Sequence, residues 1–355
     1  AATQAGCASA IPIGRITRSS GGACAPTCGR SSPPATSRRF PRRRSTCRQR
    51  CGNSGTLNRF RVASTALALL PFLGAGQTHQ DGEYRRQIDR GLYFLQRHMV
   101  TTDDGGSLYD EEGHMYGHGL ATIVLCEAYG MTRDRTLREP AQQAVRFIVA
   151  AQDPAGGGWR YRPRQPGDTS VVGWQLMALR SAELAYLEVP PITWQRADYF
   201  LDAVQSDRGS QYGYVSPGAG PATSAIGLLG RMLIGWDADH SALARGVRQL
   251  ASAGPSLPGA KVPGGMYYNY YATQVLHHVG GPLWEHWNET LRHELVGLQA
   301  TRGHERGSWY IDSGDHGARV GGRLYSTALA AMTLEVYYRY LPLYGRDSLK
   351  PPQRR

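Results

Sequence analysis

Acidic residues that begin apolar helical segments are the side chains of this 355-residue chain best suited to acid–base chemistry. Asp168 stands at the head of such a segment, where its carboxyl group could act as a general acid. The same position suits a helix N-cap, in which the carboxylate accepts backbone N–H bonds and stabilises the helix by about 1 kcal/mol. We favour the cap, because those donors would hold the carboxylate ionised, whereas an acid catalyst needs a raised pKa.

Two further candidate acids, Asp110 and Glu111, lie in a polar segment that leads to His114 and His118. Histidines four residues apart share a helix face, so these two could hold a metal ion together with one of the acids. Glycines on both sides of the histidines make a turn equally natural. We therefore predict no metal, and the sequence indicates no other cofactor.

A second set of residues could line a cavity with aromatic rings. Tyr267, Gln274 and His278, together with Tyr270 or Tyr271, fall on one helix face by the three-and-four rule. Such rings stabilise a cation without offering a nucleophile, although tyrosines equally fill a core with their hydroxyl groups at its rim. The complete set predicted to line the cavity is Tyr116, His118, Trp174, Gln175, Tyr267, Tyr270, Tyr271, Gln274, His278 and Tyr325.

Two alternating kinds of helical segment must position these residues, each with a period of roughly fifty residues. One kind is apolar on every side and must be enclosed; its members begin at Thr65, Thr122, Trp174, Ser224, Thr273 and Thr327. The other kind is amphipathic; its members contain Gly91, Ala144, Ala197, Gly246 and Leu291. The pattern predicts six inner helices walled by about five outer ones, with an Arg-rich segment where a sixth outer helix would stand.

Three of the amphipathic segments run on to a glutamine and then a Gly-aromatic turn. They are Gln152 with Gly158-Trp159, Gln205 with Gly213-Tyr214, and Gln299 with Gly307-Ser308-Trp309. In these features residues 55–345 resemble the prenyltransferase and squalene-cyclase repeat family, in particular bacterial members of unassigned activity. The resemblance implies an all-α fold, an α/α toroid whose polar connections gather above the N-termini of the inner helices.

The family's catalytic signatures are missing from the sequence. It has no Asp-x-Asp-Asp run, no Asp-x-Cys pair around Cys126 and no Cys-Gly-Glu-Gln thioester motif. The resemblance still implies a terpenoid cyclase- or prenyltransferase-like protein that binds an apolar, isoprenoid-type ligand in a central cavity. Asp168, or the carboxylates at 110–112, would then supply the acid that starts a cyclisation. A non-catalytic toroid that binds a lipid or a protein partner, and a carbohydrate-active helical barrel, remain as alternatives.

The positive charge of the chain is confined to its N-terminal arm. Residues 1–61 hold twelve arginines and no acidic residue, so the net charge of +12 comes from them alone. We therefore predict no nucleic-acid partner for the body of the protein. The arm is also rich in Ser, Pro and Cys, and we predict that residues 1–54 are disordered, as is the tail 346–355. A zinc site on the Cys24/Cys28 and Cys47/Cys51 pairs is a weaker alternative.

No apolar run in the sequence reaches the roughly 18 residues that a membrane-spanning helix needs. The longest such run, between residues 62 and 73, is interpreted as a buried helix. A cytoplasmic location or a peripheral contact with a membrane is favoured. The predicted partner is an apolar small molecule, while a protein partner stays open.

Overall fold

The structure is a computed structural model that describes residues 55–56, 59–259, 261–311 and 315–337. The predicted arm at 1–54, the cysteine pairs within it and the tail at 346–355 lie outside the described residues. Within the described part, the chain forms eleven α-helices and two small two-stranded sheets. The structure confirms the prediction of a mostly helical protein.

Six apolar helices form a closed inner ring. They are α1 (Arg61–Gly74), α3 (His114–Thr132), α5 (Thr169–Leu184), α7 (Pro221–Ile234), α9 (Gly265–Val279) and α11 (His316–Leu334). Each packs against the next in this order, and α11 packs back against α1, so the ring is complete. In this ring α5 and α11 stand opposite each other, with two inner helices between them on either side. The buried helix expected at 62–73 is α1.

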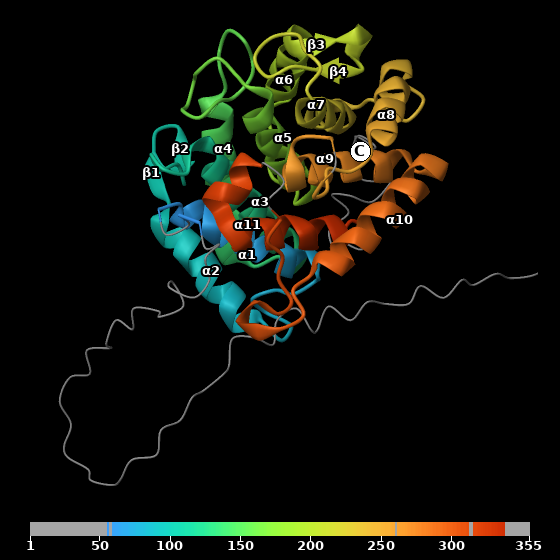
Figure 1. Cartoon of the computed structure of the whole chain (residues 1–355). Coiled ribbons are helices and arrows are strands. Elements are labelled where there is room, and N and C mark those ends of the chain that lie inside the picture. The colour runs from blue at the N-terminus through green and yellow to red at the C-terminus, as the bar shows by residue number, and fades with distance from the viewer. Residues whose placement is uncertain (1–54, 57–58, 260, 312–314, 338–355) are drawn as a thin grey trace, which may run out of the picture.

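Five amphipathic helices lie outside this ring in the described part of the chain. They are α2 (Arg85–His98), α4 (Arg135–Ala151), α6 (Pro191–Val204), α8 (Ser241–Ala253) and α10 (Gly281–Leu298). Each precedes an inner helix in the chain and packs against at least one helix of the inner ring. Figure 1 shows them at the periphery of the molecule. The described residues thus hold six inner and five outer helices, which is the predicted number.

The repeated Gln-Gly-aromatic motif ties the end of an outer helix to the connection that follows it. The indole N–H of Trp159 donates to the carbonyl oxygen of Ile148 in α4 at 2.8 Å, and the Gln152 amide donates to the carbonyl oxygen of Gly157 at 2.8 Å. The same pair of bonds recurs toward the C-terminal end of the described chain. The indole N–H of Trp309 donates to the carbonyl oxygen of Leu295 in α10, and the Gln299 amide donates to the carbonyl oxygen of Gly307. The tryptophan bonds satisfy carbonyl groups that a helix leaves unpaired at its C-terminus, and the glutamine bonds hold the turn that follows.

The small residue in the outer-helix pattern allows close contact between the rings. A Cβ atom on Gly246 of α8 would lie 2.5 Å from the Leu228 side chain of α7, which is too close for two carbon atoms. Any larger residue at this position would push α8 away from the inner ring.

The connections that lead from an outer helix to the next inner helix are long, and two of them carry short hairpins. β1 (Val100–Thr102) pairs antiparallel with β2 (Gly105–Ser107), and β3 (Gln205–Ser206) pairs with β4 (Gln211–Tyr212). Short 3-10 turns lie at η3 (Asp207–Gly209) and η4 (Gly303–Glu305). The sequence analysis did not predict these strands. None of the described helices is both long and apolar enough to cross a membrane.

Candidate active site

Asp168 lies at the N-terminal end of the inner ring and is fully buried. Its Oδ1 accepts hydrogen bonds from the Val171 amide at 3.0 Å and from the Ser170 hydroxyl at 2.6 Å, so it caps α5 as predicted. Its Oδ2 has no hydrogen-bond partner in the described part of the chain, and Arg160 Nε lies 3.9 Å away.

The ionisation of Asp168 differs from what the sequence led us to expect. A capping carboxylate was expected to be held ionised, but burial raises the pKa of Asp168 above its ordinary range by more than the Ser170 and Val171 hydrogen bonds lower it. The reason is that the whole carboxyl group is removed from water, whereas a capping carboxylate on a protein surface stays hydrated. Asp168 therefore combines a capping geometry with the pKa direction that a general acid needs.

A hydrogen-bonded network of hydroxyl groups extends from Asp168 across the ring. The hydroxyl groups of Tyr116 and Ser170 lie 2.6 Å apart, and the Tyr267 hydroxyl of α9 donates to the Ser170 carbonyl oxygen at 2.9 Å. Tyr116, Ser170 and Tyr267 are only half-buried at their side chains. Burial nevertheless raises the pKa of Tyr116 and of Tyr267 above the ordinary tyrosine value.

The network ends on a second buried carboxyl group, Asp315, which caps α11 on the opposite side of the ring. Its Oδ1 accepts from the Gly317 amide at 2.8 Å, and its Oδ2 accepts from the Tyr325 hydroxyl at 3.1 Å and the Tyr267 amide at 3.4 Å. Burial raises the pKa of Asp315, with these hydrogen bonds opposing the shift. The N-terminal end of the ring therefore holds two buried carboxyl groups joined through tyrosines.

Below this polar network the centre of the ring is filled by aromatic rings. Trp174 of α5 stacks on Tyr270 of α9 with ring centroids 5.6 Å apart, and it meets Tyr271 edge-on at 5.6 Å. All three residues are at most 2% exposed. The structure thus brings together the tryptophan and the tyrosines that the sequence placed near one cavity, and packs them against one another.

His118 lies between the two rings. Its Nδ1 accepts from the Leu108 amide at 3.0 Å, and its Nε2 lies 3.0 Å from the carbonyl oxygen of Ala144 in α4. Burial lowers the pKa of His118 to about 4, so the ring is neutral near pH 7. Both ring nitrogens are used by the backbone, so the metal site considered for His114 and His118 is wrong. Among the described residues no cluster of His, Cys, Asp or Glu side chains could hold a metal ion.

The other predicted site residues are spread over the ring. Asp110 holds the turn before α3 by accepting from the Glu112 and Gly113 amides, and Glu111 pairs with Arg162 at the exposed rim. Gln175 is fully buried and donates to the Met115 carbonyl oxygen at 2.9 Å.

Two more predicted residues lie farther along α9. Gln274 donates to the Tyr270 carbonyl oxygen at 3.3 Å. His278 lies near the C-terminal end of α9, where burial lowers its pKa to about 3. These two residues and the carboxyl pair therefore belong to different ends of the inner ring.

The sequence analysis did not select Asp315 as a candidate. A signal was available, because Asp315 and Asp168 occupy the same position in their repeats, directly before the first residue of an inner helix. What the repeat pattern could not convey is that both carboxyl groups are buried and joined by Tyr267.

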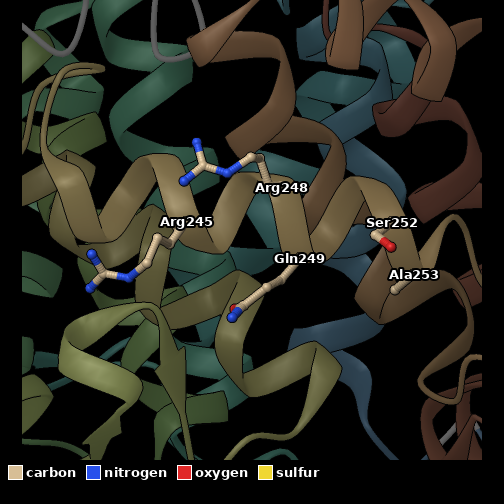
Figure 2. Close-up of a pocket in the computed structure, with 5 residues that line it drawn as sticks. All are labelled: Arg245, Arg248, Gln249, Ser252 and Ala253. Carbon is tan, nitrogen blue, oxygen red and sulfur yellow. The ribbon is translucent and has the colours of Figure 1, made fainter.

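A pocket of about 510 Å³ lies away from this site, on the outer helix α8 (Figure 2). It is lined by Arg245, Arg248, Gln249, Ser252 and Ala253. Arg245 and Gln249 donate there to oxygens of Asp207 and Arg208, at the tip of the β3–β4 hairpin. We ascribe to this part of α8 the structural role of holding the hairpin.

Comparisons with known proteins support the toroid. No protein-family model matches the sequence, and no curated protein matches it either. The structure is similar to an inactive variant of the α-1,6-mannanase GH76A of Salegentibacter sp. HEL1_6 in complex with α-1,6-mannotriose, with a TM-score of 0.53 and 10% identity over 79% of this chain and 89% of that chain.

Two other similar structures have different activities. The cellobiose 2-epimerase of Bacillus thermoamylovorans B4167 has a TM-score of 0.54 and 11% identity, over 77% of this chain and 87% of that chain. The type II terpene cyclase MstE from Scytonema has a TM-score of 0.50 and 14% identity, over 79% of this chain and 87% of that chain. At such low identity these likenesses show an α/α toroid fold and leave the activity open.

Proposed function

We propose that this protein is a carbohydrate-active enzyme that binds a sugar at the N-terminal end of its inner ring and uses Asp168 and Asp315 as an acid–base pair. One observation carries the proposal. Two buried carboxyl groups with raised pKa cap opposite inner helices, and Tyr267 lies between them: its hydroxyl donates to the carbonyl oxygen of Ser170, which bonds Asp168, and its backbone amide donates to Asp315. Enzymes that cleave glycosidic bonds commonly use two carboxyl groups in this way, one as an acid and one as a base.

The chemistry of the lining favours a hydroxylated ligand. Tyr116, Tyr267 and Ser170 are half-buried residues with hydroxyl groups beside Asp168, and Arg160 stands next to the same carboxyl group. Tyrosine and serine hydroxyl groups can donate to and accept from the hydroxyl groups of a sugar, and a guanidinium group can donate to them. Rings such as those of the tyrosines also offer apolar faces to the C–H groups of a sugar ring.

The two carboxyl groups have different roles in this proposal. Burial raises the pKa of both groups, and Asp168 is the acid because its Oδ2 lacks a hydrogen-bond partner among the described residues, whereas both oxygens of Asp315 accept hydrogen bonds. Asp168 donates its proton to the glycosidic oxygen as the bond from that oxygen to the sugar carbon breaks. Asp315 accepts a proton from the water whose oxygen bonds to that carbon, so hydrolysis is balanced without a cofactor.

An isoprenoid ligand is the second candidate. The aromatic cluster around Trp174 and a protonated Asp168 would suit a carbocation reaction, since aromatic rings stabilise cations. The arguments against it are that Trp174, Tyr270 and Tyr271 pack on one another and that the accessible lining above them carries hydroxyl groups. A non-catalytic toroid is the remaining alternative. The packing of aromatic side chains at the centre of the ring, which argues against an isoprenoid ligand, favours this alternative.

The test is to offer the full chain a panel of oligosaccharides that includes α-1,6-mannotriose and cellobiose, with squalene and a polyprenyl diphosphate beside them. Products are detected by chromatography and mass spectrometry. Turnover of a sugar that Asp168→Asn and Asp315→Asn both reduce by at least about 100-fold would support the proposal, since general acid–base groups contribute about that much or more. Conversion of only the isoprenoids would favour the second candidate.

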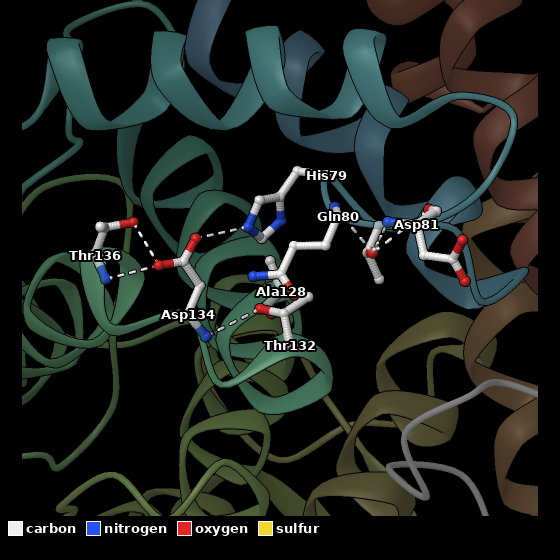
Figure 3. A network of polar contacts seen from close by, with 8 residues as sticks. His79, Gln80, Asp81, Ala128, Thr132, Asp134 and Thr136 are labelled. Carbon is white, nitrogen blue, oxygen red and sulfur yellow. Dashed lines mark hydrogen bonds and ion pairs between the residues drawn. The ribbon is translucent and has the colours of Figure 1, made fainter.

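Asp134→Asn is the matched control for these variants. Asp134 also caps a helix, because its Oδ1 accepts from the Thr136 amide at 2.9 Å at the start of α4. It follows directly after the C-terminus of α3, at the end of the ring away from Asp168, where it pairs with His79 at 2.8 Å (Figure 3). Loss of a capping carboxylate there tests whether activity falls through general destabilisation. Equal loss of activity in all three variants would contradict an acid–base role.

A further inference from the structure

Four aromatic rings form a rim beside the carboxyl pair. The ring of His114 lies 6.4 Å from that of Tyr109 and 5.6 Å from that of Tyr161. The hydroxyl groups of Tyr161 and Tyr214 are 2.7 Å apart. Tyr161 is 36% exposed and Tyr214 is 38% exposed. We call these four residues the aromatic rim.

The backbone of His114 is strained at the point where it places its ring in the rim. Its φ angle is +51°, a left-handed conformation that residues with a side chain adopt at an energetic cost. The turn is held by bonds from the His114 amide to the Asp110 carbonyl oxygen at 2.8 Å and from the Met115 amide to the Tyr161 carbonyl oxygen at 3.0 Å. The side-chain Nδ1 of His114 is buried and has no hydrogen-bond partner among the described residues.

The rim is continuous with the site of the proposed function. The ring of Tyr161 lies 5.9 Å from that of Tyr116, whose hydroxyl meets Ser170. The backbone of Tyr214 is joined to the start of α5, since the Thr169 amide donates to the Tyr214 carbonyl oxygen at 2.9 Å. Tyr161 and Tyr214 are therefore exposed aromatic residues that adjoin the hydrogen-bonded groups around Asp168.

We propose that the aromatic rim is a subsite for an additional sugar unit, so that the substrate is an oligosaccharide rather than a single sugar. This inference rests on the proposed function. Half-exposed tyrosine rings bury the apolar face of a sugar ring and keep their hydroxyl groups at its edge, which suits a ligand with both kinds of surface. The His114 ring lies beside that of Tyr161 and extends the aromatic surface of the rim.

The test compares ligands of increasing length with the full chain. Mannose and α-1,6-mannotriose form one probe series, glucose and cellotriose the other, and binding is measured by calorimetry on the Asp168→Asn variant to prevent turnover. In the series that binds, we expect the trisaccharide to bind about tenfold more tightly than the monosaccharide, as one additional aromatic contact provides. Tyr161→Ala should remove most of this difference and leave the affinity for the monosaccharide within about twofold.

A second variant separates binding from folding. Glycine adopts a positive φ without strain, so His114→Gly should keep or raise the melting temperature while it weakens trisaccharide binding. Tyr199→Ala, which removes a 62% exposed tyrosine from the outer helix α6, is the control and should change neither. A trisaccharide preference that survives Tyr161→Ala and His114→Gly would refute the subsite alone, and so would equal affinity for mono- and trisaccharide. If no sugar of either series binds, the proposed function fails with it.

Discussion

The stability of the Asp168→Asn variant relative to the wild type should increase as the pH rises. Burial raises the pKa of Asp168 from its ordinary value of 3.8 in the folded state, so the folded protein holds this proton more strongly than the unfolded chain does. The stabilisation from this group is complete below pH 3.8 and is lost as the pH rises through the folded-state pKa. Asparagine has no such charge, so the difference in unfolding free energy between the variant and the wild type should increase in favour of the variant over this range.

The same position also distinguishes the cap from the charge. Asn caps a helix about as well as Asp, whereas Ala leaves the Val171 amide and the Ser170 hydroxyl without their partner. Loss of a cap typically costs about 1 kcal/mol, and a buried donor left unsatisfied costs about 1–3 kcal/mol. We therefore expect Asp168→Ala to be less stable than Asp168→Asn by about 2 kcal/mol at every pH, or about 5 °C in melting temperature.

Urea unfolding of the three proteins at pH 4.5, 6 and 7.5 measures both effects. The reasoning would be refuted if Asp168→Asn lost stability relative to the wild type as the pH increased. That result would mean that the capping hydrogen bonds outweigh burial and hold the carboxylate ionised. It would also remove the main argument for Asp168 as an acid.

Two further predictions concern packing and a buried histidine. Burial lowers the pKa of His118 from 6.5 to about 4. As the pH falls from 6.5 to 4, the wild type should therefore lose up to about 3 kcal/mol of unfolding free energy relative to His118→Gln, which urea unfolding measures. The same pH dependence in both proteins would contradict the argument from burial. Gly227→Ala should destabilise by about 1–3 kcal/mol in thermal unfolding, because its Cβ would lie 2.2 Å from the Tyr212 ring. Its control, Gly297→Ala in α10, has no neighbour within 4 Å and should stabilise by about 0.5–1 kcal/mol.

The sequence by itself determined the architecture. Helices that are apolar on every side must be enclosed, and amphipathic helices of the same period are able to enclose them, so the toroid and its helix count followed from the repeats. The cap at Asp168 also followed from the sequence, because a cap depends on residues adjacent in the chain. The Gln-Gly-Trp motif was recognisable for the same reason, since Gln152 and Trp159 bond to groups of their own connection and outer helix.

Only the tertiary structure decided which side chains meet at the site. An inner helix that is apolar all round carries no signal for its orientation, so the sequence could not show that His118 bonds outward to α4 while Tyr116 reaches Ser170 of α5. The partnership of Asp168 and Asp315 depends on helices about 150 residues apart that closure of the ring brings face to face. The raised pKa of both carboxyl groups also depends on the tertiary structure, because burial is its largest cause and the residues around each group come from segments far apart in the sequence.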